Sequence, residues 1–287
     1  MNPIGIMQGR LSPPATFRLQ AFPWNSWQQE FENARQCQID LIEWLFEADD
    51  YDKNPIWGEE GIQAIKKQVA ASGTRVLTCC ADYFMPHPFF RVSEMERKES
   101  IRVLNQLIRN TAQVGVRTIL VPVLEICEIR TPAEKDQLLE SLREPLKIAE
   151  EEGVILGLET EMLAPDYLAL VKEGGSSRLG VYYDTGNNAA QGHDITADAS
   201  ILAPYLVGIH VKDRKLGGST VLLGEGDADF DGFFQVVRRA GYTHPVILQT
   251  AFGHDYLGIA RRHTHFVATR LQSPVSERPT GPRKAAQ

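Results

Sequence analysis

The sequence has no apolar run long enough to cross a membrane and no excess of basic residues. No apolar stretch approaches the roughly 20 residues of a transmembrane helix, and the N-terminus lacks the basic segment and apolar core of a signal peptide. The 287 residues carry a formal net charge of −7, whereas a nucleic-acid surface needs clustered Lys and Arg. We therefore expect a cytoplasmic protein with neither a membrane nor a nucleic acid as partner.

Cysteine is scarce, and the glycine motifs that bind phosphate are missing. The four cysteines, Cys37, Cys79, Cys80 and Cys127, lack the spacing of zinc ligands, and reduced thiols are expected in a cytoplasmic protein. Neither GxGxxG nor GxxxxGK[ST] occurs, which argues against a doubly wound nucleotide-binding sheet. There is no internal repeat and no break in composition that would mark a domain boundary.

Short apolar runs alternate with amphipathic segments along the whole chain. The runs are bounded by Gly or polar residues and are rich in aliphatic side chains, as is typical of buried strands. They predict strands at residues 4–7, 41–46, 75–80, 118–124, 154–159, 179–184, 206–211 and 246–250. Helix-like stretches lie at residues 27–36, 61–71, 93–114, 132–152, 166–173, 198–205, 230–240 and 256–271.

Eight strands alternating with eight helices match a (β/α)8 barrel, or TIM barrel, in number, order and length. We predict a single barrel domain over residues 1–272. Residues 273–287 have no apolar period and are predicted to be a disordered tail. The proline-containing residues 10–25 are predicted to form a long loop above the first strand, which serves either as a lid or as a plain connector.

Four later strands end in a residue that can bind a hard divalent cation, namely Glu159, Asp184, His210 and Gln249. The active site of such a barrel lies at the carboxyl ends of the strands. A polar side chain at the end of an apolar strand needs a partner. Each residue alone has a structural explanation, since a rim Asp or Glu often caps a helix. Four on successive strands point instead to a shared ligand.

The types of ligand limit the metal to Mn²⁺, Mg²⁺, Co²⁺ or Zn²⁺, because two carboxylates, one imidazole and one amide oxygen contain nothing soft. Open coordination positions would accept adjacent oxygens of a small substrate. A metal bound by a carbonyl and its neighbouring hydroxyl acidifies the C–H bond between them. The sequence therefore favours chemistry that passes through an enediolate.

The same residues, with their neighbours, resemble those of the xylose isomerase-like barrels. Within that family they are most similar to the sugar-phosphate isomerases and epimerases, such as the pentulose-5-phosphate 3-epimerases and the ketose 3-epimerases. The resemblance follows the order of elements from Ile4 to Arg270 and is sharpest from Glu159 to Gln249. It rests on the segments Leu158-Glu159, Tyr183-Asp184-Thr185-Gly186-Asn187, Ile209-His210-Val211-Lys212-Asp213 and Leu223-Gly224-Glu225-Gly226-Asp227.

The resemblance implies a divalent metal held by Glu159, Asp184, His210 and the residue at position 249. It also implies that two of the carboxylates exchange protons with opposite faces of a sugar or sugar phosphate. Asn187 stands at a substrate-contacting position, and Arg214 is near a position that binds a substrate hydroxyl or phosphate.

Further polar residues near strand ends are candidates for substrate contact. Glu43 and Asp82 are such carboxylates, and Lys212 could anchor a phosphate together with Arg214. Asp213 is predicted to orient one of these cations. Other candidates are Glu125, Glu161, His254, the aromatic residues Trp44, Tyr83 and Phe84, and the loop at residues 224–226.

Gln249 departs from the family pattern, which has Glu at this position. An amide oxygen can bind a metal but cannot accept a proton at neutral pH, so the two-base epimerase mechanism loses one base. Glu159 alone could still move a proton between adjacent carbons on one face, which is aldose–ketose isomerisation. Another group could also replace the missing base.

The leading prediction is a divalent-metal-dependent sugar or sugar-phosphate isomerase/epimerase in which Glu159 is the base. A metal-dependent dehydratase of a polyol or keto acid and a non-catalytic sugar-binding relative are the alternatives. An endonuclease IV-like repair enzyme needs three metals and more rim histidines than seven in the whole chain allow. The sequence leaves open whether the protein forms a homo-oligomer.

Overall fold

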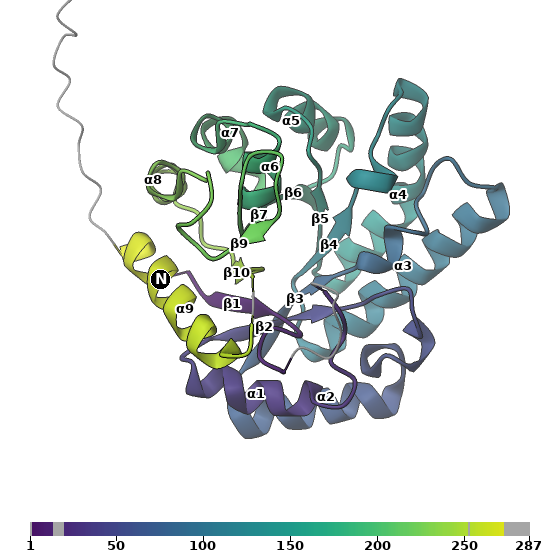
Figure 1. The fold of residues 1–287 in the computed structure, drawn as a ribbon. Helices are drawn as coiled ribbons and strands as arrows, with labels where there is room; N and C mark the ends of the chain where they lie inside the picture. The colour runs from purple at the N-terminus through teal and green to yellow at the C-terminus, as the bar shows by residue number, and fades with distance from the viewer. Residues whose placement is uncertain (1, 14–19, 252, 273–287) are drawn as a thin grey trace, which may run out of the picture.

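Eight parallel strands close into the predicted barrel in the order β1-β10-β7-β6-β5-β4-β3-β2 (Figure 1). The computed structural model describes residues 2–13, 20–251 and 253–272. Pairing of Ile4 with Val246 joins the first and last strands of the barrel. The strands are β1 (Ile4–Met7), β2 (Leu41–Leu45), β3 (Arg75–Cys80), β4 (Thr118–Pro122), β5 (Ile155–Glu159), β6 (Leu179–Asp184), β7 (Leu206–Val211) and β10 (Val246–Leu248).

Helices surround the strands, as Figure 1 shows. Ser93 and Thr131 start two of them with capping boxes, and Gly73, Gly115 and Gly153 end three in the left-handed conformation that glycine tolerates. None of the described helices is long and apolar enough to cross a membrane. The helices are α1 (Trp27–Gln36), α2 (Glu59–Ser72), α3 (Glu94–Val114), α4 (Pro132–Glu152), α5 (Ala164–Glu173), α6 (Thr185–Ala190), α7 (Ile195–Leu202), α8 (Phe230–Arg239) and α9 (Tyr256–Gln272).

The predicted strand boundaries were slightly too wide. The predictions for residues 41–46, 118–124, 154–159 and 246–250 each extend one or two residues beyond the observed strand. The apolar pattern continues there because the barrel buries the loop residues next to the strand ends as well as the strands. Val123 and Thr250, for example, are both buried outside a strand.

A short helix and a two-stranded hairpin near the carboxyl ends of the strands were not predicted. Helix α6 has the sequence TGNNAA, which carries no apolar period, and its start depends on Asp184, whose side chain accepts a hydrogen bond from the Asn187 backbone N–H. The two-residue strands β8 (Asp213–Arg214) and β9 (Thr220–Val221) form a small antiparallel hairpin after β7. Helix α7 begins and ends three residues before its predicted bounds.

Part of the predicted loop at residues 10–25 and all of the predicted tail lie outside the described residues, which omit 14–19 and 273–287. The prediction of a single domain with a disordered tail therefore stays a prediction.

Close packing inside the barrel fixes the position of Tyr182 on β6. A Cβ atom at Gly208 on β7 would lie 2.2 Å from Cε2 of the Tyr182 ring. Only glycine at this position lets the ring lie flat against β7, and the Tyr182 hydroxyl then reaches Glu43 on β2. The sequence of β7 thus sets a contact that spans the barrel interior.

We expect Gly208→Ala to lower the free energy of unfolding by about 1–3 kcal/mol, because the added methyl group overpacks the Tyr182 ring. Chemical denaturation monitored by circular dichroism measures the change. Gly253→Ala is the matched control, since its Cβ would make only an ordinary contact of 3.6 Å with Ile259. Equal stability of the two variants would contradict the proposed packing constraint.

Candidate metal and substrate site

Three predicted ligands converge at the carboxyl ends of β5, β6 and β7. Glu159 ends β5, Asp184 ends β6, and His210 is the penultimate residue of β7. Asp184 and His210 are paired directly in the register of their strands. One ligand atom from each residue lies within 4.8 Å of the other two. The Nδ1 atom of His210 is 3.8 Å from Glu159 Oε1 and 3.9 Å from Asp184 Oδ2.

These atoms fit a divalent cation. Ligand atoms held about 2.0–2.3 Å from one ion lie roughly 3–4.5 Å from each other. Nδ1 of His210 and Oδ2 of Asp184 are buried without a hydrogen-bond partner in the structure, although buried polar atoms normally have one. Carboxylate oxygens and an imidazole nitrogen are donors for Mn²⁺, Mg²⁺, Co²⁺ and Zn²⁺. The cluster therefore has the composition, spacing and unsatisfied atoms of a metal site.

Glu43, predicted as a substrate contact, lies behind His210 and is fully buried. Its Oε2 atom is 2.6 Å from His210 Nε2, and its Oε1 atom accepts a 2.5 Å hydrogen bond from the Tyr182 hydroxyl. Both carboxylate oxygens are thus engaged by the protein. This arrangement turns Nδ1 of His210 toward Glu159 and Asp184, as carboxylate partners do for metal-binding histidines in general.

The buried charges shift the pKa values of the cluster. Burial acts to lower the pKa of His210, but the nearby carboxylates of Glu43 and Glu159 outweigh it and raise that pKa from 6.5 to about 10. Burial raises the pKa of Glu159, and the nearby positive charge of His210 opposes that shift. At neutral pH, His210 therefore keeps its second proton unless a metal displaces it.

Asp184 both caps a helix and faces the candidate metal site. Its Oδ1 atom accepts a 2.7 Å hydrogen bond from the backbone N–H of Asn187 and so caps α6. Its Oδ2 atom faces the cluster and lies 3.5 Å from Nζ of Lys212. The helix cap fixes the carboxylate plane, which in turn aims the second oxygen at the other two ligands.

Asn187, Lys212 and Arg214 form a hydrogen-bonded group beside the cluster. The Asn187 side-chain oxygen accepts from Lys212 Nζ and from Arg214 Nη1, each at 3.1 Å. Its amide nitrogen lies 3.4 Å from Glu159 Oε1. Arg214 also donates from Nε and Nη2 to the carbonyl of Gly218 in the β8–β9 hairpin. The predicted substrate contacts therefore lie together, and all of them are partnered within the protein.

Gln249 follows β10 and is also buried at this end of the barrel. Its amide oxygen, which is the atom able to bind a metal, accepts a 2.9 Å hydrogen bond from Lys212 Nζ. Its amide nitrogen donates to the side-chain oxygen of Gln20 at 3.1 Å. The geometry connects Gln249 to the cluster through Lys212, and metal ligation by Gln249 stays a prediction.

Asp82 joins this network from the other side of the barrel mouth. The side-chain nitrogen of Gln20 donates to Asp82 Oδ2, and the Cys80 thiol lies 3.1 Å from Asp82 Oδ1. Burial raises the pKa of Asp82. One chain of hydrogen bonds therefore runs from Lys212 through Gln249 and Gln20 to Asp82.

Among the remaining candidates, Glu161 is half-buried and accepts a hydrogen bond from Gln191 at 3.2 Å. Glu125 and His254 are exposed. Asp213 was predicted to orient one of the neighbouring cations, but within the described part of the chain its carboxylate makes no hydrogen bond or ion pair with Lys212 or Arg214. Its carboxylate instead accepts backbone N–H groups of the loop that includes residues 224–226.

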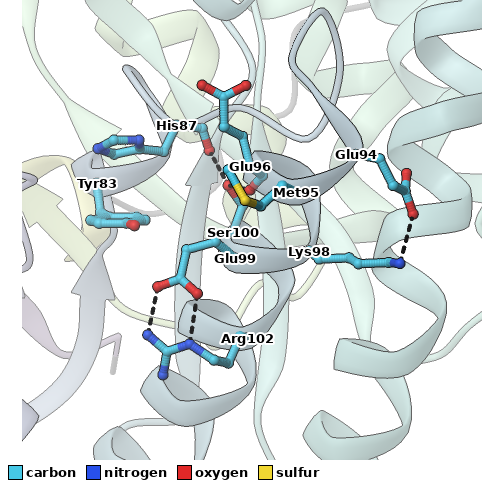
Figure 2. Close-up of a pocket in the computed structure, with 9 residues that line it drawn as sticks. All are labelled: Tyr83, His87, Glu94, Met95, Glu96, Lys98, Glu99, Ser100 and Arg102. Atoms are coloured by element: carbon cyan, nitrogen blue, oxygen red, sulfur yellow. Dashed lines mark hydrogen bonds and ion pairs between the residues drawn. The ribbon is translucent and has the colours of Figure 1, made fainter.

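The aromatic candidates pack mainly within the fold. Trp44 and Phe84 are fully buried, and Trp44 Nε1 donates to Asn54. Tyr83 stacks on His87 with ring centroids 4.6 Å apart, at the edge of a surface cavity of about 970 Å³ over the first turns of α3 (Figure 2). None of the metal-cluster residues lines this cavity. Figure 2 shows that its charged side chains pair locally, as in the contact of Glu99 with Arg102.

Tyr182 and Gln20 belong to the site but were not among the predicted site residues. Tyr182 lies two positions before Asp184 on the same strand, so strand alternation alone places both on one face. Gln20 lies in the loop after β1, where no periodic pattern marks a residue that returns to the barrel mouth.

Comparison with known proteins agrees with this fold. L-ribulose-5-phosphate 3-epimerase UlaE of Escherichia coli (strain K12) is 24% identical over 232 residues, which cover 78% of this chain and 81% of that protein. The structure of an L-ribulose 3-epimerase covers 95% of both chains with a TM-score of 0.76 and 19% identity. A xylose isomerase-like TIM barrel protein from Mycobacterium smegmatis in complex with magnesium covers 96% of this chain and 98% of its own, with a TM-score of 0.72 and 17% identity.

The family described as the xylose isomerase-like TIM barrel matches residues 31–264 of the sequence. This match includes the strands from β2 to β10 and all three residues of the metal cluster. The chain belongs to the xylose isomerase-like TIM barrel family.

Proposed function

We propose that this protein is a divalent-metal-dependent isomerase or epimerase that acts on a sugar or sugar phosphate through an enediolate. The observation that carries the proposal is the convergence of Glu159, Asp184 and His210, with two of their atoms buried and without a hydrogen bond. Sugar epimerases among its relatives and structural neighbours support the same reaction class. The complex of one neighbour with magnesium supports a metal as cofactor.

When bound, the metal would polarise two adjacent substrate oxygens and acidify the C–H bond between them. Glu159 is the proposed base that takes this proton. Its buried position raises its pKa, which brings the carboxylate nearer to the range where a base both accepts and returns a proton. Asn187 lies against the Glu159 carboxylate and would hold it in place for the transfer.

The amide at Gln249 favours a one-base reaction over a two-base epimerisation. A two-base route requires a second group that takes or gives a proton on the opposite face of the substrate, and an amide does neither at neutral pH. Glu159 alone suffices for transfer between adjacent carbons on one face. We therefore favour aldose–ketose isomerisation, with epimerisation requiring another proton donor from the barrel mouth.

Mn²⁺ binding is expected to tighten as the pH rises from about 6 to 8. Below a pKa of about 10 the metal-free His210 carries a proton on each ring nitrogen, so the ion must displace the Nδ1 proton. One displaced proton raises the apparent affinity about tenfold per pH unit. Calorimetric titration in buffers of different ionisation enthalpy measures the affinity for Mn²⁺ and the number of protons released on binding.

Glu43→Gln is the matched variant for that titration. The change removes the carboxylate that holds His210 protonated and oriented, so we expect fewer protons released and an affinity about 10- to 100-fold weaker. A wild-type affinity that does not depend on pH, with no proton released, would remove Nδ1 of His210 from the metal site.

Glu159→Gln is expected to slow proton exchange by about 10²- to 10⁴-fold, because the amide cannot act as the base. The assay follows exchange of the C–H protons next to the carbonyl by NMR in D₂O over a panel of ketoses and their phosphates. Glu125→Gln, an exposed carboxylate at the same end of the barrel, is the control and should retain exchange. Full activity of Glu159→Gln would eliminate Glu159 as the base.

Gln249→Glu is expected to raise Mn²⁺ affinity by about tenfold or more, which corresponds to about 1.4 kcal/mol. A third carboxylate would neutralise the ion more fully than the amide does. Competition with a chelator measures the affinity. Gln249→Ala is the control, since it removes the same amide without adding charge. Unchanged affinity in Gln249→Glu would mean that position 249 does not reach the metal.

A further inference from the structure

A phosphorylated substrate needs a place for its phosphate. Barrels of this class commonly hold phosphate with the loops after the last two strands and the N-terminus of a helix there. Backbone N–H groups and the helix dipole supply the attraction. The corresponding region here comprises the loop between β7 and α8 and the start of α9.

In the loop after β7, the carboxylate of Asp213 occupies the position that a bound phosphate would take. Asp213 Oδ2 accepts the backbone N–H groups of Gly224 and Gly226, both at 2.8 Å, and Oδ1 accepts that of Ala228 at 3.3 Å. Asp213 is buried. A Cβ atom at Gly226 would lie 1.9 Å from Asp213 Oδ1, so the loop is closed tightly around the carboxylate. These amides are not available to a phosphate.

The helix N-termini next to this loop are filled in the same way. Asp229 Oδ1 accepts the backbone N–H of Gly232 in the first turn of α8 at 3.1 Å. Asp255 Oδ1 accepts that of Gly258 in the first turn of α9 at 3.0 Å. Each carboxylate offsets the positive end of its helix dipole. A second anion at either end would meet the negative charge of this carboxylate.

The cations that the structure describes at the barrel mouth, Lys212, Arg214 and Arg10, also have partners already. Lys212 donates to Asn187 and Gln249 and lies near Asp184, while Arg214 donates to Asn187 and to the Gly218 carbonyl. Arg10 donates from Nε to the Thr250 carbonyl. A phosphate would have to displace these contacts to gain a cation.

Glu161 adds a carboxylate at the same end of the barrel. It is half-buried on the segment after β5, two residues beyond Glu159, and it accepts a hydrogen bond from the Gln191 side chain at 3.2 Å. A phosphate dianion near Glu161 would be repelled by this carboxylate.

From these contacts we infer that the site takes a neutral, unphosphorylated hydroxy-ketone sugar or polyol and discriminates against its phosphate ester. Asp213 and Glu161 are the specificity-determining residues. Asp213 occupies the backbone N–H groups of the loop that could bind an anion, and Glu161 repels anions at the barrel mouth. The inference deepens the function proposed above and rests on it.

The test compares L-ribulose with L-ribulose 5-phosphate, and D-fructose with D-fructose 6-phosphate, on the Mg²⁺-loaded full-length protein. Calorimetry gives the dissociation constants, and NMR in D₂O gives the rates of C–H exchange. We expect each free sugar to bind at least about tenfold more tightly than its ester, because the phosphate would meet the carboxylates of Asp213 and Glu161 where Asp213 already occupies the loop N–H groups. Tighter binding or faster exchange of an ester, or no binding of either free sugar, would overturn the inference.

The binding measurements test the preference for the free sugar, and the C–H exchange measurements test the proposed reaction. Preferential binding of the free sugars without any C–H exchange would contradict the proposed reaction and leave the preference standing. Exchange that is faster with the esters would support the reaction and contradict the preference.

Two variants probe the residues. Glu161→Lys is expected to shift the ratio of ester to free-sugar affinity by about fivefold or more toward the ester, since it reverses a charge at the mouth. Glu151→Lys is the matched control, because Glu151 is exposed near the end of α4, just before β5 begins and so at the opposite end of the barrel. An equal ratio of ester to free-sugar affinity in Glu161→Lys and Glu151→Lys would show that Glu161 does not determine the preference.

Asp213→Ala exposes the backbone N–H groups of the loop and is expected to give the protein measurable affinity for inorganic phosphate. Circular dichroism establishes whether this variant folds, and Glu161→Lys tests the inference independently if it does not. A folded Asp213→Ala variant that binds phosphate no better than wild type would show that Asp213 does not exclude the anion.

Discussion

The buried contact between Glu43 and His210 is the interaction on which the candidate site depends. It joins a carboxylate from β2 to an imidazole from β7 inside the barrel, where neither side chain is exposed to water. Tyr182 satisfies the second oxygen of Glu43. Removing one partner of a buried ion pair leaves an uncompensated charge, which typically costs about 3–5 kcal/mol. The contact between Glu43 and His210 that links β2 to β7 therefore also orients His210 toward Glu159 and Asp184.

Much of this architecture could be predicted from local sequence patterns. Alternating apolar and amphipathic segments predicted the barrel because a parallel sheet buries whole strands and needs a helix between them. The rule that barrels place their sites at the carboxyl ends of strands brought Glu159, Asp184 and His210 together, and the structure confirms that convergence. Strand alternation also correctly turned His210 toward the interior.

Other features depend on contacts between distant parts of the chain. Nothing near Glu43 in the sequence indicates that its partner is His210, 167 residues away. Helix α6 was missed because Thr185–Ala190 has no apolar face, and the helix owes its start to a cap from Asp184. Asp213 was assigned to a neighbouring cation, yet it binds backbone N–H groups of a glycine-containing loop. Such a contact appears only when the loop has folded.

Each hydrogen bond at Gln249 has a defined donor and acceptor, and this limits how a Glu, the family residue, could occupy position 249. Lys212 donates to the Gln249 oxygen, the Gln249 nitrogen donates to Gln20, and Gln20 donates to Asp82. A carboxylate at position 249 has no proton to give at neutral pH, so the Gln20 oxygen would lose its donor. A carboxylate at position 249 therefore keeps this contact only if the Gln20 amide turns over and its nitrogen leaves Asp82, although 229 residues separate Gln20 from Gln249 in the sequence.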